Sequence, residues 1–401
     1  MAISPFNRLL KSTFLPAPVH RLVEEVPEDI RTLFSEGSLR RYRHRLKAVE
    51  GVWFCDTRQV NANQTPGLVC AHNHVYSALA RGMPAPPRTP TQFSEILELV
   101  WWRLDRALDE DTIEWSAKLA ALTALESGCT AVIDHHESPN AIGGSLSIIA
   151  DAFAEVGVRV NCAYGVTDRH GPDGAAAGLL ENDRFLSEGG LGKVGLHAAF
   201  TCEDDTIAAA AELGRKHGVG VHVHVAEGAE DTWERLRGHT NDDWLLVHGV
   251  HLPDDHGLHG TIVHNPRSNM NNAVGYSRPR RFSNSVALGT DGIGTDMLDE
   301  FRVAFVKSRE EDVTATPEIA WDWLTAGWDL FPEARGDVVT WSYGDMSPWK
   351  LAYTTALSPV RVEIDGELLL DDGSPTKVDA AEIRAKANEA AARLFSRLEN
   401  L

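Results

Sequence analysis

The feature that most constrains this fold is a regular alternation of short apolar runs with longer amphipathic stretches between Val69 and Asp291. Such a rhythm is typical of repeated β/α units that build a parallel sheet. The apolar runs indicate eight strands, over residues 67–71, 130–134, 159–166, 193–198, 220–225, 244–250, 260–264 and 285–289. Eight parallel strands with helices between them most simply close into a barrel, so we predict an α/β fold of the (β/α)8 TIM-barrel type.

Outside this region the pattern changes. The segment VRVEIDGELLLDDG predicts a β-hairpin that turns at Asp365 and Gly366, because Asp-Gly between two apolar runs favours a two-residue turn. Residues 1–65 are poorly patterned. We therefore predict three regions: an N-terminal segment over 1–65 that forms part of a reduced β-sandwich, the barrel over 66–330, and a small β appendage with a terminal helix over 331–401.

Charge and cysteine content narrow the class of function. The chain has 401 residues and a formal net charge of −20, which argues against nucleic-acid partners and anionic membrane surfaces. A small-molecule substrate is the expected partner, and a homodimer stays open. The five cysteines show no CxxC spacing, so a reducing cytoplasm is the expected compartment. Since no run approaches the ~18 apolar residues of a membrane span, we expect a soluble chain.

The first candidate site is His72-Asn73-His74, which directly follows the apolar run PGLVCA. Alternate residues of a strand share a face, so the two imidazoles can lie close enough to bind one cation. Two polar residues in an ordinary loop are the alternative.

Three more apolar runs carry imidazole or carboxylate side chains at or near their ends. One contains His222 and His224 and is followed by Glu227, the next ends at His248, and the last is followed by Asp291. Each has a structural alternative, because buried histidines can be satisfied by hydrogen bonds and an aspartate before glycine is common in turns. Burying several such groups at one barrel mouth without partners costs free energy, so we predict a shared metal site. Spacing alone leaves open which of the two histidines is the ligand.

The order of the motifs resembles a known family. PGLVCAHNH, LHAAFT, VHVHVAEG, LLVHGVHL, HNPRSNMNN and ALGTDG follow one another as in the cytosine/guanine deaminase-like branch of the amidohydrolase superfamily. Within this branch the chain is most similar to the SsnA-type aminohydrolases, through AHNHVYSALARG, WWRLDRALDED and TAVIDHHESPN. The resemblance extends over about residues 65 to 370.

This resemblance implies roles for individual residues. The implied ligands of one divalent metal are His72, His74, His224 and Asp291. Glu227 corresponds to the proton shuttle, His248 to the imidazole that polarises water or substrate, and Asp291 also takes part in catalysis. His197, within LHAAFT, corresponds to a substrate contact, and His222 is then structural.

Further candidates for substrate contacts lie near the expected strand ends. His135 and His136 follow the second strand, Arg169 the third and Trp102 the first, and Asn269 lies within HNPRSNMNN. Supporting, surface or core roles are the alternatives for these side chains.

The implied chemistry is hydrolysis of a C–N bond by hydroxide that the metal generates from water. Zn2+ is the expected metal, and Fe2+ or Mn2+ fit the same ligands. We predict deamination of an amino-substituted purine, pterin or pyrimidine-like ring. The alternatives are hydrolysis of a cyclic amide, an amidine or a carbon–halogen bond by the same site, and a binding barrel without catalysis.

Overall fold

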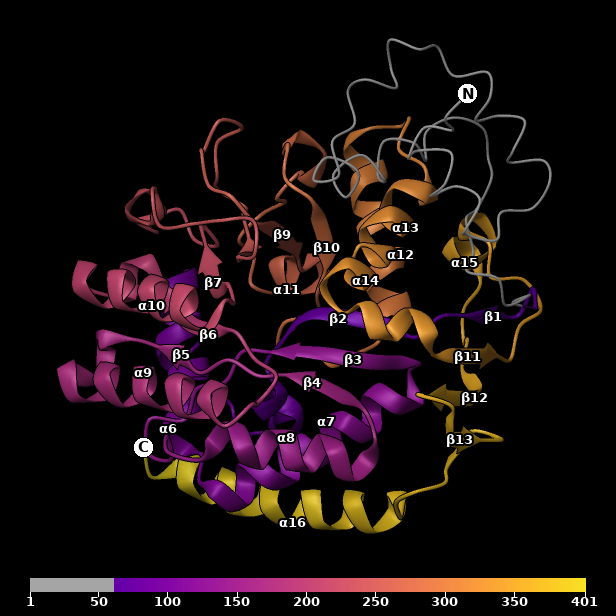
Figure 1. Ribbon diagram of the computed structural model, residues 1–401, viewed down its shortest axis with the longest axis horizontal. Helices are drawn as coiled ribbons and strands as arrows, with labels where there is room; N and C mark the ends of the chain where they lie inside the picture. Colours follow the sequence, from indigo (N-terminus) through magenta and orange to yellow (C-terminus); the bar gives the residue numbers. More distant parts are fainter. Residues whose placement is uncertain (1–60) are drawn as a thin grey trace, which may run out of the picture. The chain divides into compact units, whose positions relative to one another are not determined.

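The computed structural model describes residues 61–401, and its centre is built from parallel strands (Figure 1). Six of them form one sheet: β5 (Gly165–Val166), β6 (Val194–Ala198), β7 (Val221–Val225), β8 (Leu245–His248), β9 (Thr261–His264) and β10 (Val286–Leu288). Three form a second sheet: β2 (Leu68–Asn73), β3 (Cys129–Asp134) and β4 (Arg159–Asn161). The predicted parallel α/β arrangement is thus present.

The strands are buried on both faces, as expected of parallel strands covered by helices. Along β2 the side chains alternate between two apolar clusters, with Val69 and Ala71 in one and Leu68 and Cys70 in the other. The smaller cluster gathers residues from several strands and the helical segment that follows them: Val69, Ala71, Ala131, Ile133, Leu245, Val247, Val263, Ala287, Phe331 and Ala334. The larger cluster lies between the strands and the helices.

The third predicted strand, over residues 159–166, is interrupted. It divides into β4, which pairs with β3, and β5, which pairs with β6. At Tyr164 the side-chain amide of Asn182 takes the place of a neighbouring strand: it accepts from the Tyr164 N–H at 3.0 Å and donates to the Tyr164 carbonyl at 2.9 Å. A side chain from α9 (Gly171–Ser187), the next α-helix along the chain, thus bonds the backbone at the point where the run is divided.

Isolated parallel bridges join the two sheets beyond the ends of their strands. His136 bridges to Tyr164 on one side, and Asn73 bridges to Asp291 on the other. On the second side the N–H groups of Thr290 and Asp291 donate to the His72 carbonyl at 2.9 and 3.1 Å. The end of β10 is thus held beside the end of β2.

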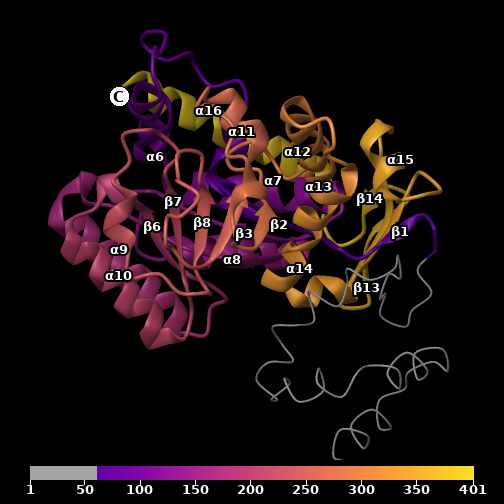
Figure 2. The same ribbon diagram turned by 90° about the horizontal axis from the view of Figure 1, so that it is seen from above.

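Helices surround the strands, and α16 runs alongside α7 (Figures 1 and 2). The helices of the barrel region are α5 (Phe93–Ile96), α6 (Trp102–Ala107), α7 (Glu110–Glu126), α8 (Ser145–Val156), α9 (Gly171–Ser187), α10 (Asp204–His217), α11 (Pro266–Asn271), α12 (Met297–Glu311), α13 (Pro317–Thr325) and α14 (Gly327–Leu330). Later in the chain come α15 (Pro348–Tyr353) and α16 (Ala380–Glu399). Short turns of other helix types are η2 (Val75–Ala80), η3 (Leu97–Trp101), η4 (Asp168–His170), η5 (Ala199–Thr201), η6 (Trp233–Leu236), η7 (Pro279–Arg281) and η8 (Pro332–Gly336).

A separate antiparallel sheet contains most of the C-terminal strands. Its order is β1 (Gln64–Thr65), β11 (Val338–Trp341), β12 (Pro359–Ile364), β13 (Glu367–Asp371) and β14 (Ser374–Pro375). The predicted hairpin is confirmed, because β12 and β13 pair antiparallel around Asp365 and Gly366, whose φ angles are 52° and 81°. The predicted β-sandwich segment over 1–65 lies outside the described residues, except for its last few residues, which include β1.

Among residues 61–401, no helix has both the length and the apolar character that crossing a membrane requires.

Candidate metal centre

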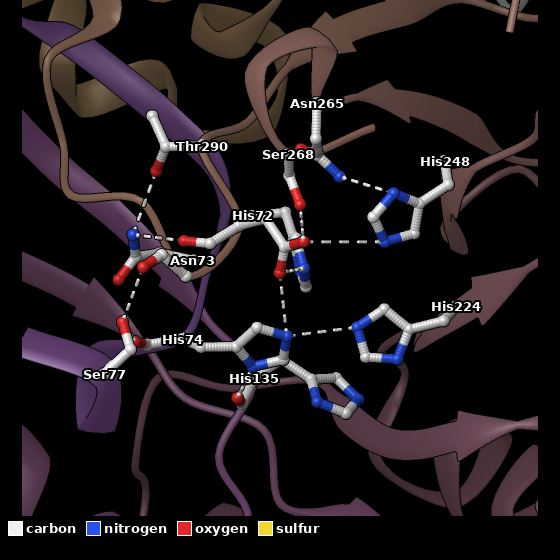
Figure 3. A network of polar contacts seen from close by, with 12 residues as sticks. His72, Asn73, His74, Ser77, His135, His224, His248, Asn265, Ser268 and Thr290 are labelled. Carbon is white, nitrogen blue, oxygen red and sulfur yellow. Dashed lines mark hydrogen bonds and ion pairs between the residues drawn. The ribbon is translucent and has the colours of Figure 1, made fainter. Parts of the chain in front are cut away.

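Four side chains from separate strand ends meet in one cluster. His72 and His74 come from the end of β2, His224 from β7, and Asp291 from the segment after β10. One potential ligand atom from each lies within 4.8 Å of all the others. Oδ1 of Asp291 is 3.3 Å from His72 Nε2 and 3.0 Å from His74 Nε2, and His74 Nε2 is 3.2 Å from His224 Nε2 (Figure 3).

The backbone fixes the orientation of two of these imidazoles. Nδ1 of His74 donates to the His135 carbonyl at 2.6 Å, and Nδ1 of His224 donates to the His197 carbonyl at 2.8 Å. Because a carbonyl only accepts, each Nδ1 carries a hydrogen and each Nε2 offers a lone pair in the neutral ring. Two lone pairs and a carboxylate thus face one another, an arrangement that needs a positive charge between them.

A third imidazole nitrogen, His72 Nε2, also lacks a partner that a cation at the cluster would supply. His72 Nε2 is buried and has no hydrogen-bond partner among the described residues, while its Nδ1 lies 2.8 Å from Nε2 of His222. Three nitrogens and one carboxylate oxygen are a donor set that suits Zn2+ and related divalent cations. The residues present therefore fit a metal ion, and His222 lies behind His72 as its support.

Burial and the Asp291 charge set the protonation of the cluster. Burial lowers the pKa of His72 to about 3. Burial also acts to lower the pKa of His74, but the hydrogen bond and charge of Asp291 outweigh it and raise this pKa to about 9. Burial would raise the pKa of Asp291, but the two histidines hold it well below its usual range. A proton on His74 thus supplies the positive charge in the metal-free chain, and a bound cation would displace it.

Neighbouring polar groups hold Asp291 in place. Oγ of Ser268 donates to Oδ2 of Asp291 at 2.5 Å (Figure 3). Nδ2 of Asn73 donates to the Asp291 carbonyl at 2.9 Å and to Oγ1 of Thr290 at 2.9 Å. The sequence interpretation assigned no role to these three neighbours, although Ser268 lies within the HNPRSNMNN motif that it singled out.

The backbone is strained where these strands end. Ala226, His248 and Asp291 have φ angles of 49°, 73° and 55°, in the left-handed region that residues with a side chain seldom occupy. Such conformations cost on the order of 1–3 kcal/mol each and concentrate at functional sites. Here they occur at Ala226, which precedes Glu227, and at His248 and Asp291, whose side chains face the cluster.

Glu227 and His248 form the second part of the centre. Nδ1 of His248 lies 2.8 Å from Oδ1 of Asn269, so it donates there and leaves Nε2 toward the cluster. That nitrogen is 3.4 Å from Oε2 of Glu227 and 3.9 Å from Oδ2 of Asp291. Burial raises the pKa of Glu227 to about 7, and its Oε1 accepts from Asn272 at 3.3 Å. Glu227 can therefore hold or release a proton near neutral pH.

A cavity opens beside this cluster. Its lining comprises His74, Tyr76, Phe93, Leu97, Trp101, Trp102, Asp105, Glu137, His197, Ala198, Phe200, His224, Glu227, Asp231, His248, Asn272 and Asp291. Of the predicted substrate contacts, His197 and Trp102 belong to this lining.

The other predicted substrate contacts lie around the cavity. His135 is buried against His224, with ring centroids 4.6 Å apart, and His136 bonds Ser138. Asn269 reaches the site through His248. Arg169 pairs with Glu137, a carboxylate that the sequence interpretation did not consider even though it directly follows the two histidines.

Comparisons with curated proteins find relatives that are named as deaminases. The chain is 29% identical to a 5'-deoxyadenosine deaminase of Methanopyrus kandleri, covering 82% of this chain and 86% of that protein. It is 27% identical to a 5-methylthioadenosine/S-adenosylhomocysteine deaminase of Symbiobacterium thermophilum, with the same coverage of 82% and 86%.

Among solved structures, it is similar to a zinc-bound adenosine deaminase from Xanthomonas campestris, with a TM-score of 0.70, 21% identity and coverage of 83% of this chain and 86% of that one. A zinc complex of atrazine chlorohydrolase from Arthrobacter aurescens matches with a TM-score of 0.65, 18% identity and coverage of 82% and 88%. These two likenesses show a shared TIM-barrel-type fold.

The profile of the Amidohydrolase family matches residues 64–326, which carry all four residues of the cluster together with Glu227 and His248. The chain belongs to the amidohydrolase family.

Proposed function

We propose that this chain is a metal-dependent aminohydrolase that replaces the amino group of a heterocycle with oxygen and releases ammonia. The observation that carries the proposal is the cluster of buried imidazole nitrogens and one carboxylate, which needs a cation and opens into a cavity. Its relatives named as deaminases of 5'-deoxyadenosine and of 5-methylthioadenosine support an amino-substituted purine as the first ring to test.

In this proposal His72, His74, His224 and Asp291 hold one divalent cation. Zn2+ is our choice, because the ligands are nitrogen and oxygen atoms and two proteins of the same fold were solved with zinc. A divalent cation in such a site lowers the pKa of a coordinated water toward ~7, which makes that water a nucleophile at neutral pH.

The residues around the cation then move protons and bind the ring. A carboxylate oxygen of Asp291 accepts the proton of the attacking water. Glu227, whose pKa burial raises to about 7, donates a proton to a ring nitrogen or to the departing amine. His248, fixed by Asn269, stabilises the negative charge that develops on the oxygen and nitrogen atoms bonded to the attacked carbon. Water and the aminated ring become ammonia and a carbonyl compound.

We also propose a closed barrel and the boundaries expected from the sequence. The bridge between Asn73 and Asp291 supports closure between β10 and β2, with β4 and β5 counted together as the third of eight strands. The boundaries are a segment over 1–65, a barrel over 66–330 and an appendage over 331–401. The C-terminal sheet, with strands between residues 338 and 375, supports the last boundary.

The test is ammonia release by the purified, zinc-loaded full chain with a panel of aminated purines, pterins and pyrimidines. We expect at least one of these rings to lose its amino group. The product mass separates the reaction classes: exchange of NH for O adds about one dalton, whereas opening a ring adds a whole water. Ring opening or halide release without ammonia would overturn the deaminase assignment, and failure of the purified chain to bind zinc would overturn the metal centre.

A further inference from the structure

The helix α11 supplies side chains that hold the reacting groups of the proposed mechanism. Ser268 donates to a carboxylate oxygen of Asp291, and Asn269 accepts from Nδ1 of His248. The two residues are neighbours on one helix, so a single element orients both groups. Glu227 is the third such group, and its partner comes from the residue that directly follows this helix.

Asn272 holds Glu227 and is buried beside it. The residue belongs to the cavity lining and is only 5% exposed. Nδ2 of Asn272 donates to Oε1 of Glu227 at 3.3 Å and to Oγ of Ser268 at 3.4 Å. An amide nitrogen carries two hydrogens, so both are used. The two bonds connect Glu227 with the serine that holds Asp291.

The orientation of this amide is determined by its neighbours. Nδ2 of Asn271 donates to Oδ1 of Asn272 at 3.2 Å, so a donor already occupies the oxygen end of the amide. If the amide were turned over, its oxygen would face the carboxylate of Glu227, and two acceptors would repel each other. The amide therefore presents N–H to Glu227.

A role in ending the helix does not account for this side chain. The backbone N–H of Asn272 closes α11 by donating to the Ser268 carbonyl at 2.8 Å. In the described part of the chain, none of the side-chain bonds of Asn272 goes to a helix carbonyl. The bonds from its Nδ2 go instead to polar groups of the metal centre.

The bond to Oε1 of Glu227 leaves the other carboxyl oxygen for chemistry. Oε2 of Glu227 is 3.4 Å from Nε2 of His248. Because an N–H group keeps Oε1 as an acceptor, a proton that Glu227 carries is placed on Oε2, the oxygen beside His248. The last torsion of a glutamate side chain has broad minima, so without this bond the carboxyl could turn.

We propose that Asn272 is a positioning residue for Glu227: its amide fixes Oε1 so that Oε2 delivers the proton to the ring or to the departing amine. This inference rests on the proposed function and adds a residue to its proton-transfer machinery. A proton donor that is oriented before the reaction needs no reorientation in the transition state. Asn272 then contributes to kcat rather than to the binding of substrate or metal.

Asn272→Leu tests the proposal, because leucine has nearly the shape of asparagine but no N–H groups. On the zinc-loaded full chain we expect kcat for ammonia release to fall about tenfold, as for a lost hydrogen bond to a charged group, with KM within about twofold. Zinc content should equal that of the unmodified chain. Asn272→Ala, which only removes atoms, should show the same split. A loss of zinc, or a rise in KM without a fall in kcat, would overturn the proposal.

The matched control is Asn284→Leu, at an amide that also donates two hydrogen bonds but lies outside the cavity lining. Its Nδ2 donates to the carbonyls of Leu258 and Gly260 at 3.2 and 2.9 Å. We expect kcat per folded molecule to stay within about twofold of the unmodified chain. An equal fall in both variants would assign the loss to the fold and overturn the positioning role.

A double variant shows through which group Asn272 acts. In the Glu227→Gln background, Asn272→Leu should change kcat by less than about twofold, because the proton donor that Asn272 orients is absent. Single-turnover kinetics measure these slow reactions. The same tenfold loss in that background would show that Asn272 acts through another group, such as Ser268, and would overturn the proposal.

Crystal structures of the unmodified chain and of Asn272→Leu, both with zinc, do not depend on turnover. We expect the Glu227 carboxyl to keep one orientation in the unmodified chain and to turn away from His248 in the variant. An unmoved carboxyl would overturn the positioning role. A displaced carboxyl in a chain that releases no ammonia from any ring would support the positioning role and overturn the proposed function.

Discussion

Two regions of this chain place non-glycine residues in the left-handed backbone region at or near the end of a strand, with different results. At the C-terminal hairpin, Asp365 and Gly366 adopt φ angles of 52° and 81° in succession, as a two-residue hairpin turn requires. At the strand ends of the metal centre, His248 and Asp291 adopt 73° and 55°. Strain that serves a turn is structural, whereas strain that aims a polar side chain at a shared point marks a site.

Asp291→Asn is the strongest test of this difference between the hairpin turn and the metal centre. We expect activity to fall by about a thousandfold or more, because the variant loses both an anionic ligand and a proton acceptor. Bound zinc should also fall, which metal analysis of the purified protein measures. Asp365→Asn is the matched control: the same atoms change at a positive φ in the hairpin, and activity should stay within about twofold. Equal losses in the two variants would contradict the comparison.

Glu227→Gln tests the residue that follows the strained Ala226. Loss of a proton donor should lower kcat by about 10²- to 10⁴-fold, while zinc content stays at that of the unmodified chain. Steady-state ammonia release and metal analysis on the same preparation measure both. A variant that loses zinc along with activity would instead make Glu227 a ligand.

Ser268→Ala removes the hydroxyl that bonds Oδ2 of Asp291 at 2.5 Å. Groups that orient a metal ligand typically contribute 10- to 100-fold to metal affinity, so we expect an affinity loss of about that size. Competition with a chelator dye measures it. Ser342→Ala, at an exposed hydroxyl that accepts from the N–H of Ser358 beside the C-terminal sheet, should leave metal affinity unchanged, and a loss there would contradict the local effect.

Gly366→Ala tests whether the positive φ in the hairpin turn is purely structural. A methyl group at a φ of 81° is strained, so the free energy of unfolding should fall by about 1 kcal/mol. Denaturant unfolding measures this change, and activity per folded molecule should not change. A loss of activity beyond the unfolded fraction would show that the hairpin contributes to the site.

Much of the site could be predicted because its signals are local. An apolar run ending in an imidazole or a carboxylate is visible in the sequence, and this pattern led to His72, His74, His248 and Asp291 as well as to β2, β8 and β10. The pairing of Arg169 with Glu137 carried no such signal. Asp105 lies in a helix and Glu137 and Arg169 follow two different strands, so only the folded chain brings both carboxyl groups to the Arg169 guanidinium.

The sequence by itself determined which segments become strands and which polar groups stand at their ends, because alternation along a strand depends only on neighbouring residues. Tertiary structure decided what depends on register between strands. His222 and His224 share a face of β7. In the pairing of β7 with β8, His224 lies opposite Val247, next to His248, whereas His222 lies opposite Leu245, nearer the start of both strands. It also decided that Asn182 would interrupt the third strand, because its amide reaches Tyr164 only in the folded chain.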